Sequence, residues 1–554
     1  MSLYKLPIYN KNMNVHKITS ARGGLSDWED KGTPGSFKFG ANLDIRKIVD
    51  SISCTQALMD IGVTEDSASA SISPSASVSP SASSSPSPSP SRSPSASISP
   101  SPNSPSASVS PSASKSPSAS SSPSASTSPS SSVSPSPSES PGLRLFKDLI
   151  QWFVKASDGF IYGFGNTGRV YRINPDDFYA KQVYDVGSPI LGAEEKPASG
   201  TTYLVFATNT EIHIKELPGD SNWNDVNSLN GWPKTNLTSA DYHTMKQVAG
   251  DVLIANGSNV ALIGYDNSYT NEAVNLIPGN IVKTIVERSG RGVFGTYRAG
   301  EPNNGINGAI DAEVPLSQVG SDGNIYFADM VNSMPVKRFP GGGKVNPGGV
   351  TNLVDQVNFF DWEFTALSWI DKQSVGNMAV FAVYSAESGK GGLYTMGRKY
   401  KNHPFTMNLE HQLDADELGA CVAHNNLLYV SYRDGSDFGV KVTDVNNKAT
   451  GIYEAYDFKS PLKGAEKITK YAFAEIFMKP LPAGCSVEFY YRMNKLDDFV
   501  QAKTADGETQ YSTTNGKKAV FRIGEQGDIY EARAVLNPYG NTCPELYRIH
   551  TFFE

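Results

Sequence analysis

The chain has 554 residues, a formal net charge of −8 and 19% charged residues. It carries no basic stripe, which argues against duplex DNA or an anionic membrane as the main partner, and we expect no sequence-specific nucleic-acid binding. No segment reaches the roughly 18 apolar residues that a membrane span requires, and the N-terminus lacks the apolar core of a signal peptide. We therefore expect no membrane span, and synthesis in a cytoplasm.

The N-terminal residues 1–66 are predicted to form an arm. Residues 23–62 begin with several glycine-containing turns, then change to apolar segments. The apolar spacing within 45–52 fits a helix, whereas Ile52, Cys54 and Gln56 alternate as in a strand, and the period alone does not separate the two. The arm is too short to form a core of its own, so we expect it to pack on something else.

Residues 67–141 form a low-complexity run of serine, proline and alanine. Prolines recur six residues apart, as at Pro74, Pro80 and Pro86, in a unit close to S-P-S-A-S-x. Such a segment has almost nothing to bury and cannot offset its own ordering entropy. We expect an extended, polyproline-II-like spacer, either disordered or ordered only where copies bundle in an assembly.

Residues 142–462 repeat the pattern strand, turn, strand. The first strands are predicted at 150–154, 160–164 and 169–173, with turns at Ser157-Asp158-Gly159 and Asn166-Thr167-Gly168. Related hairpin patterns follow at 201–217, 251–266, 291–298, 321–339, 378–397 and 425–445. Their spacing is close to the length of one four-stranded propeller blade, so six or seven blades would fit. A pair of stacked sheets is the alternative.

Residues 463–554 alternate differently. In the segment 480–492, Val487, Phe489 and Tyr491 fall on one face of a strand, and further strands are predicted at 519–523, 530–536 and 545–553. This pattern predicts a small antiparallel β-sandwich. The fold class expected is therefore all-β, with a six- or seven-bladed β-propeller-like body, a C-terminal β-sandwich, an N-terminal extended arm and a Ser/Pro-rich linker.

Three segments carry a family resemblance. The arm contains GGL (23–25) and NLDI (42–45), and the sandwich contains PLPAGCSVEFYYR (480–492) and ends with PELYRIHTFFE (544–554). Together with a divergent propeller, they resemble virion structural proteins of tailed bacteriophages, of the tail nozzle, tail-tip or fibre-associated type. The Ser/Pro hexads depart from that pattern and resemble an insertion between arm and propeller.

The resemblance implies an oligomer built into a virion, with other virion proteins and copies of the chain as partners and the arm reaching a neighbouring subunit. It implies assembly in the host cytoplasm, in the tail or the head–tail connector region. No catalytic residue lies in the matched motifs, so we expect no enzyme activity, no cofactor and no catalytic, cofactor-binding or metal residue. The alternatives are a receptor- or glycan-binding adhesin on the same scaffold, and a propeller carbohydrate-active enzyme.

Two groups of polar residues are candidate sites. Asp361 and Glu363 flank Trp362, as paired carboxylates do in glycosidases, but also as a solvated strand face would. The alternation here does not decide between these. His403, His411 and His424 lie near Asp414, Asp416 and Glu417 but lack metal-site spacing such as HExxH, which favours surface and loop histidines.

The remaining motifs favour loops. Residues 339–349 contain glycines and Lys344 but not the P-loop spacing, and residues 174–178 and 433–439 have turn chemistry without calcium-loop spacing. Aromatic residues in predicted loops could bind a host-surface glycan or pack between blades. These are Trp223, Trp232, Tyr265 and Tyr269.

The four cysteines are too widely spaced for a zinc site and too few for a disulfide scaffold. They are Cys54, Cys421, Cys485 and Cys543. We expect buried, reduced thiols. Cys485 and Cys543 fall in one predicted domain and could approach each other.

Overall fold

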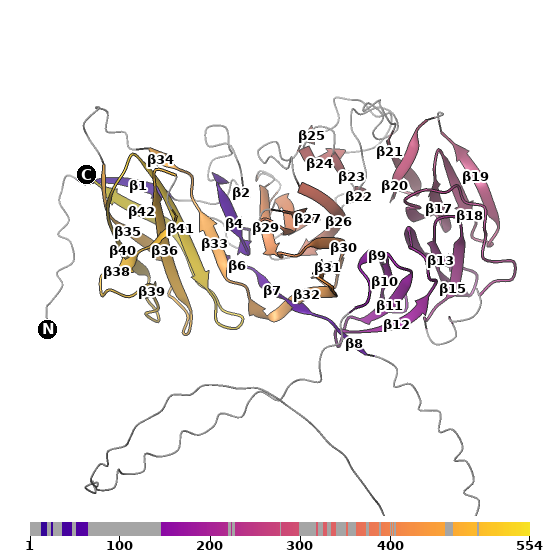
Figure 1. The fold of residues 1–554 in the computed structure, drawn as a ribbon, viewed down its shortest axis with the longest axis horizontal. Helices are drawn as coiled ribbons and strands as arrows, with labels where there is room; N and C mark the ends of the chain where they lie inside the picture. Colours follow the sequence, from indigo (N-terminus) through magenta and orange to yellow (C-terminus); the bar gives the residue numbers. More distant parts are fainter. Residues whose placement is uncertain are drawn as a thin grey trace, which may run out of the picture. The chain divides into compact units, whose positions relative to one another are not determined.

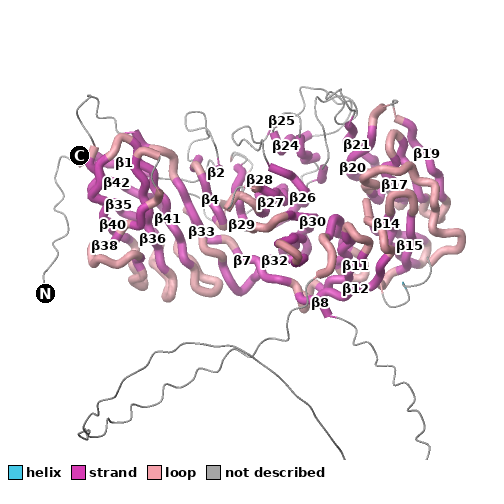
Figure 2. The backbone as a smooth tube through the Cα atoms, viewed as in Figure 1, coloured by secondary structure: helices cyan, strands magenta, loops and turns pink. Residues whose placement is uncertain are grey.

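A computed structural model gives the fold of the chain. It describes residues 13–18, 24–25, 36–46, 51–64, 146–219, 223, 228–276, 279–297, 317–319, 325–329, 334–339, 351–352, 362–372, 376–386, 389–398, 400, 403, 406–459, 469–495 and 498–554. The chain divides into two units, residues 1–65 with 143–554, and residues 66–142. All described strands belong to the first unit, and the predicted spacer lies outside the described residues. In the described part, Figure 2 shows strands and loops without a helix.

Seven successive sheets make up the propeller in the described residues. They are β9 (Ile150–Lys155), β10 (Ile161–Gly165), β11 (Arg169–Asn174) and β12 (Tyr179–Asp185); β13 (Gly192–Ala198), β14 (Thr201–Ala207) and β15 (Ile212–Glu216); β16 (Met245–Val248), β17 (Asp251–Asn256), β18 (Asn259–Ile263) and β19 (Tyr269–Asn275); β20 (Ile281–Arg288) and β21 (Arg291–Tyr297); β22 (Ser317–Val319), β23 (Ile325–Asp329), β24 (Met334–Phe339) and β25 (Thr351–Asn352); β26 (Trp362–Lys372), β27 (Gly376–Ser385), β28 (Gly392–Arg398) and β29 (Thr406–Gln412); and β30 (Glu417–His424), β31 (Leu427–Asp434) and β32 (Asp437–Lys448).

The first strands of these sheets close a ring. Strand β9 contacts β13, and the contacts continue in order through β16, β20, β22, β26 and β30, which contacts β9 again. A ring of sheets joined through their first strands is the β-propeller arrangement. The predicted propeller is therefore confirmed, with seven blades in the described part of the chain.

The first blade shows why these residues form strands. The turns predicted at Gly159 and Gly168 are present, and both glycines have positive φ, 89° and 109°, which side chains with a Cβ rarely adopt. Between these turns, every residue of β10 is buried. A middle strand of a blade is covered on both faces by neighbouring blades, so it consists of small and apolar residues rather than alternating ones.

The C-terminal part forms two sheets that pack face to face. One contains β35 (Lys470–Met478), β38 (Lys503–Thr504), β40 (Lys518–Gln526) and β42 (Glu545–Phe553); the other contains β33 (Gly451–Glu454), β34 (Phe458–Lys459), β36 (Ser486–Met493), β37 (Val500–Gln501), β39 (Gln510–Tyr511) and β41 (Ile529–Asn537). The predicted inward face of β36, with Val487, Phe489 and Tyr491, is buried in the shared core. The second sheet starts at β33, on the propeller side of the boundary expected after residue 462.

The N-terminal segment, residues 13–64, supplies strands to both bodies. Its strands are β1 (Asn14–Ile18), β2 (Gly24–Leu25), β3 (Ser36–Phe37), β4 (Phe39–Ala41), β5 (Leu43–Asp44), β6 (Ile52–Cys54), β7 (Gln56–Asp60) and β8 (Gly62–Thr64). Strands β1 and β6 pair with β42, β4 lies between β29 and β33, β7 completes the seventh blade beside β32, and β8 pairs with β12 of the first blade. Figure 1 shows these indigo strands among the orange and yellow ones.

This pairing bears on two points about the arm. The described part of the arm packs on its own chain, and the contact with a neighbouring subunit that the resemblance implied stays a prediction. The segment around residue 52 is a strand, because Ile52 and Cys54 pair across from β42 and β5. The alternation of Ile52, Cys54 and Gln56 was therefore the correct indication, and a helix here would leave the edges of two sheets unpaired.

The flanks of the Ser/Pro-rich run belong to one junction of the propeller. On one side, β8 pairs in parallel with β12 of the first blade. On the other, Phe146 forms a β-bridge with Phe438 of β32, in the seventh blade, and its ring lies 4.8 Å from that of Tyr171. The run is therefore an insertion that leaves and rejoins the propeller between its first and last blades. The described part of the arm that precedes the run packs on the same body that follows it.

Candidate functional site

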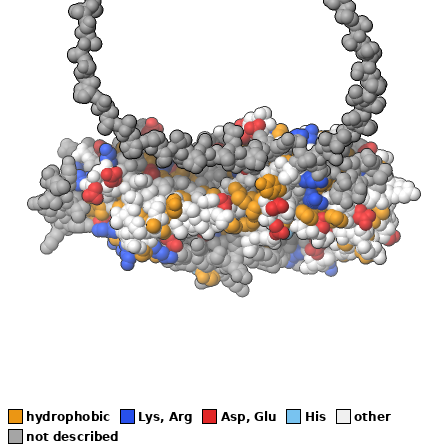
Figure 3. Space-filling model, turned by 90° about the horizontal axis from the view of Figure 1, so that it is seen from below, with side chains coloured by type: hydrophobic (Ala, Val, Ile, Leu, Met, Phe, Trp, Pro, Cys, Tyr) orange, Lys and Arg blue, Asp and Glu red, His pale blue; other side chains and the backbone are white. Residues whose placement is uncertain are grey.

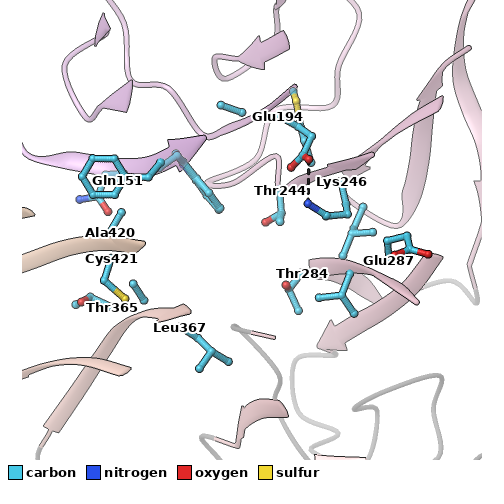
Figure 4. Close-up of a pocket in the computed structure, with 17 residues that line it drawn as sticks. Gln151, Glu194, Thr244, Lys246, Thr284, Glu287, Thr365, Leu367, Ala420 and Cys421 are labelled. Carbon is cyan, nitrogen blue, oxygen red and sulfur yellow. Dashed lines mark hydrogen bonds and ion pairs between the residues drawn. The ribbon is translucent and has the colours of Figure 1, made fainter. Parts of the chain in front are cut away.

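A central cavity of about 580 Å³ is the candidate site of the propeller. Residues from the first strands of six blades line it, namely β9, β13, β16, β20, β26 and β30. Its volume falls in the range of about 300–1,000 Å³ that small-molecule sites occupy. Figure 4 shows that its wall mixes charged, hydroxyl and apolar side chains.

Glu194 and Lys246 are an ion pair within this wall. The Lys246 Nζ lies 2.9 Å from Glu194 Oε1, joining the second blade to the third (Figure 4). The Lys246 side chain is 38% exposed and the Glu194 side chain is 17% exposed. Burial raises the pKa of Glu194, and the Lys246 ammonium opposes that shift. Glu287 of β20 also lines the cavity, so the wall contains a second carboxylate besides Glu194 (Figure 4).

Two hydroxyl groups of the wall donate hydrogen bonds from one blade to the next. Thr244 Oγ1 donates to the Lys283 carbonyl at 2.7 Å, from the third blade to the fourth. Thr365 Oγ1 donates to the Gly419 carbonyl at 3.1 Å, from the sixth blade to the seventh. Each of these two hydroxyls thereby satisfies a backbone carbonyl of the next blade.

Two further hydroxyls accept bonds across blade boundaries. Ser431 Oγ accepts the Ile150 amide at 2.9 Å, which joins the seventh blade to the first. Ser368 Oγ accepts the Ala423 amide at 3.2 Å, between the sixth and seventh blades. The ring is thus closed by specific hydrogen bonds as well as by apolar packing.

The predicted carboxylate pair is only partly described. Glu363 lies in β26, where its backbone pairs with Tyr384, and Asp361 lies outside the described residues. In this part of β26 the structure describes side chains only from Thr365 onward, so the glycosidase hypothesis for Asp361 and Glu363 falls outside the described side chains.

The predicted histidines are distributed rather than clustered. His411 is buried in β29, His424 ends β30, and the ring of His403 packs edge-on against Tyr400 with centroids 4.9 Å apart. Burial lowers the pKa of His424. Among the described residues, no group of three His, Cys, Asp or Glu side chains could hold a metal ion.

The acidic residues near these histidines fix loops. Asp414 Oδ1 accepts the Gly389 amide at 2.8 Å, Asp416 Oδ2 accepts the Gly435 amide at 2.8 Å, and Glu417 pairs with Arg433 at 3.0 Å. The turn at 433–439 is the hairpin between β31 and β32, and the turn at 174–178 joins β11 to β12. The glycine-rich segment with Lys344 lies outside the described residues.

The four candidate aromatic residues do not form one exposed cluster. Trp223 is buried, stacks on Tyr162 and donates its indole N–H to the Glu216 carbonyl at 2.7 Å. Trp232 packs edge-on against Tyr269, whereas Tyr265 is half exposed. Packing between strands and loops therefore accounts for three of the four.

Sequence reasoning missed the cavity residues. Glu194, Lys246 and Thr365 look like ordinary strand residues, and they meet only because the first strands of distant blades converge on one axis. A usable signal would have been their shared place, since each lies in the first strand of a blade.

The fold defines the class of protein as a β-propeller joined to a β-sandwich. No protein-family model and no curated protein matches the chain. Solved structures similar in fold include the β-propeller domain of Myceliophteria thermophila Cps50 (Swd1), at 10% identity and TM-score 0.38, covering 54% of this chain and 97% of that one. The RRP9 WD40 repeats match at 11% identity and TM-score 0.34, covering 54% and 95%.

A third similar structure is the extracellular domain of a one-component system from B. thetaiotaomicron. It matches at 11% identity and TM-score 0.34, covering 69% of this chain and 55% of that one, so the chain spans about half of its length. At these identities the similarity concerns the fold alone. Within the described residues, no helix is both long and apolar enough to cross a bilayer. On the face drawn in Figure 3, acidic and basic side chains are scattered among each other.

Proposed function

We propose that the protein is a non-enzymatic structural component of an assembled particle, and that it works by packing against other proteins and copies of itself. The observation that carries the proposal is the use of polar groups in the central cavity. Glu194, Lys246 and Thr244 bond across blade boundaries, where a catalytic site would direct them toward a substrate. A tailed-phage virion, assembled in the host cytoplasm, is the particle that the sequence motifs suggest.

The strand pairings of the N-terminal segment support a role in which the protein withstands mechanical force. It adds strands to the sandwich, to the first and seventh blades and to the sheet between β29 and β33. Pulling the propeller away from the sandwich would have to break these strand pairings together. A chain reinforced in this way suits a particle component that must keep its shape under stress.

Ion pairs also join the N-terminal segment to the sandwich. Lys38, beside β4, pairs with Glu531 of β41 and with Asp457, and Arg492 of β36 pairs with Glu531 at 2.5 Å. Burial opposes ionisation of Glu531, but its hydrogen bonds to Arg492 and Lys38 together lower its pKa. The carboxylates of Glu531 and Asp457 are buried, so removing their cationic partners would leave an unpaired charge inside the protein.

The mass of the purified chain in solution tests the proposal. Light scattering on the full chain should give a closed oligomer, and electron microscopy should show particles of matching symmetry. Because residues 36–64 are part of the fold, removing the whole arm would unfold the protein. A deletion of residues 1–12, which precede the described strands, is therefore the informative variant for a role of the terminus in assembly.

A glycan array on the same preparation separates the alternatives. Specific, saturable glycan binding by a monomer would overturn the structural proposal in favour of the adhesin. Turnover of a glycan that Glu194→Gln abolishes would overturn it in favour of an enzyme. An oligomer without either activity supports the proposal.

A further inference from the structure

Two cysteines from opposite ends of the chain meet in the sandwich core. Cys54 ends β6, and Cys543 lies two residues before β42, the strand with which β6 pairs. The Cys543 Sγ lies 4.0 Å from the Cys54 carbonyl oxygen, and each thiol shifts the pKa of the other. Both belong to the main apolar core, and all four cysteines of the chain are free thiols.

This arrangement differs from the pair suggested by the sequence. Cys485 Sγ lies 3.5 Å from the Thr542 hydroxyl, so it is close to the segment of Cys543. The thiol that shifts the pKa of Cys543 is nevertheless that of Cys54, whose carbonyl oxygen lies 4.0 Å from Cys543 Sγ. The two cysteines lie far apart in the sequence. They meet only because the N-terminal segment pairs with a strand of the sandwich.

We propose that Cys54 and Cys543 form an intramolecular disulfide when the protein meets a peroxide, and that the bond fastens the N-terminal segment to the C-terminal sandwich. The register that pairs Glu545 with Ser53 puts the cysteines on neighbouring backbones. Continued by one residue, that register sets Cys54 opposite Pro544, the residue next to Cys543. Diagonal neighbours on strands about 5 Å apart fall inside the Cα–Cα range of about 4.4–6.8 Å that a disulfide spans.

The surroundings select which sulfur reacts first. Cys543 keeps 9% of its surface exposed, whereas Cys54 is fully buried. The hydrogen bond with Cys54 lowers the pKa of Cys543 to about 7, and the nearby Lys448 ammonium acts in the same direction. The Lys448 Nζ is held beside the pair by a 2.7 Å bond to the Cys54 carbonyl. Because the thiolate is the nucleophile, Cys543 is the site of attack and Cys54 the resolving thiol.

The reaction balances with one peroxide per disulfide. The Cys543 thiolate attacks one oxygen of hydrogen peroxide, the O–O bond breaks, and sulfenic acid and hydroxide form. The Cys54 sulfur then attacks the Cys543 sulfur, its proton and the hydroxyl of the sulfenic acid leave as water, and the S–S bond forms. The two sulfurs together lose two electrons, and the peroxide gains them. A water-sized oxidant suits a sulfur that is only slightly exposed.

Mass spectrometry of the full chain tests the proposal directly. After peroxide treatment and alkylation, we expect two free thiols instead of four and a cross-linked peptide pair containing Cys54 and Cys543. The melting temperature should rise by on the order of 5 °C, because the bond closes a very long loop. The oxidation rate should increase with pH through about 7, and Lys448→Met should move that midpoint upward.

Matched variants separate this pair from the other thiols. Cys54→Ala and Cys543→Ala should each abolish the cross-link and the rise in melting temperature, whereas Cys421→Ala and Cys485→Ala should retain both. Four thiols still free after treatment, a cross-link through Cys485, or sulfinic acid at Cys543 without a cross-link would overturn the proposal. If a variant fails to fold, mass spectrometry of the peroxide-treated wild-type chain still tests the proposal.

Discussion

Arg46 shows how a single residue joins the N-terminal segment to the propeller. Its side chain is 6% exposed, and its guanidinium donates to the Thr395 hydroxyl at 2.9 Å, to the Thr395 carbonyl at 3.1 Å and to the Thr406 carbonyl. Glu410 lies 4.0 Å away. A buried guanidinium is tolerated only where carbonyls and a carboxylate replace its water.

Replacing Arg46 should therefore be costly. Arg46→Met would leave two buried carbonyls without this donor and remove the positive charge beside the buried Glu410, and we expect a loss of about 2–4 kcal/mol in the free energy of unfolding. Urea denaturation measures this loss. The matched control is Arg433→Met, whose partner Glu417 is exposed and for which a loss below about 1 kcal/mol is expected. Equal losses would show that Arg46 is not a structural anchor.

The cavity pair Glu194 and Lys246 allows a second residue-scale prediction. If the pair links two blades, Lys246→Met should lower the free energy of unfolding by about 1 kcal/mol, since the partly buried Glu194 loses its counter-ion. Glu194→Gln should cost less, because an amide still accepts a bond from Lys246. Thermal unfolding of both variants checks this order, and a reversed order would contradict the link.

At the scale of an element, the histidine in β1 makes the pairing of this strand sensitive to pH. It pairs with β42, and the His16 ring stacks on Phe458 with centroids 4.0 Å apart. Burial lowers the pKa of His16 to about 4. A histidine buried as the neutral ring stabilises the folded state above its unfolded pKa of about 6.5 and loses that contribution as pH falls toward 4.

We therefore expect β1 to loosen in acid before the rest of the sheet. Between pH about 7 and about 5, protection factors for residues 14–18 in hydrogen exchange should fall about tenfold, with β35 and β40 unchanged. His16→Phe keeps an aromatic ring on Phe458 without a titrating group, and should remove the effect. If that variant loosens equally, another group such as His550, whose pKa burial also lowers and which pairs with Lys17, is responsible.

At the scale of the whole molecule, the N-terminal segment and the Ser/Pro-rich run have opposite roles. Residues 36–64 complete sheets in both the propeller and the sandwich. Residues 66–142 form a separate unit whose two flanks belong to one junction. An insertion between two points of the same junction adds loop entropy but removes no sheet pairing, and that cost grows slowly with length.

Deleting residues 67–141 should therefore leave the body intact. With a short glycine-serine linker in its place, we expect the melting temperature to change by less than about 2 °C. Deleting residues 36–64 should instead expose the edges of β32, β33 and β42 and prevent cooperative unfolding. Calorimetry of both variants tests this contrast, and a large drop for the first would mean that the run packs on the fold.

The sequence by itself determined the local structure. Turn chemistry at Gly159 and Gly168 and the alternation of Val487, Phe489 and Tyr491 placed strands correctly, because φ preference and a two-residue period depend on near neighbours. The spacing of the hairpins indicated a propeller because it is close to the length of one four-stranded blade.

Only the tertiary structure decided the rest. That Cys54 meets Cys543, that Glu194 meets Lys246 and that the N-terminal segment belongs to both bodies depend on pairings between distant strands. An unpaired sheet edge can pair with any strand of suitable pattern. The sequence of β7 or β8 therefore does not predict which strand it pairs with. The choice follows from the closure of the ring and the shared sandwich core, which are properties of the folded chain as a whole.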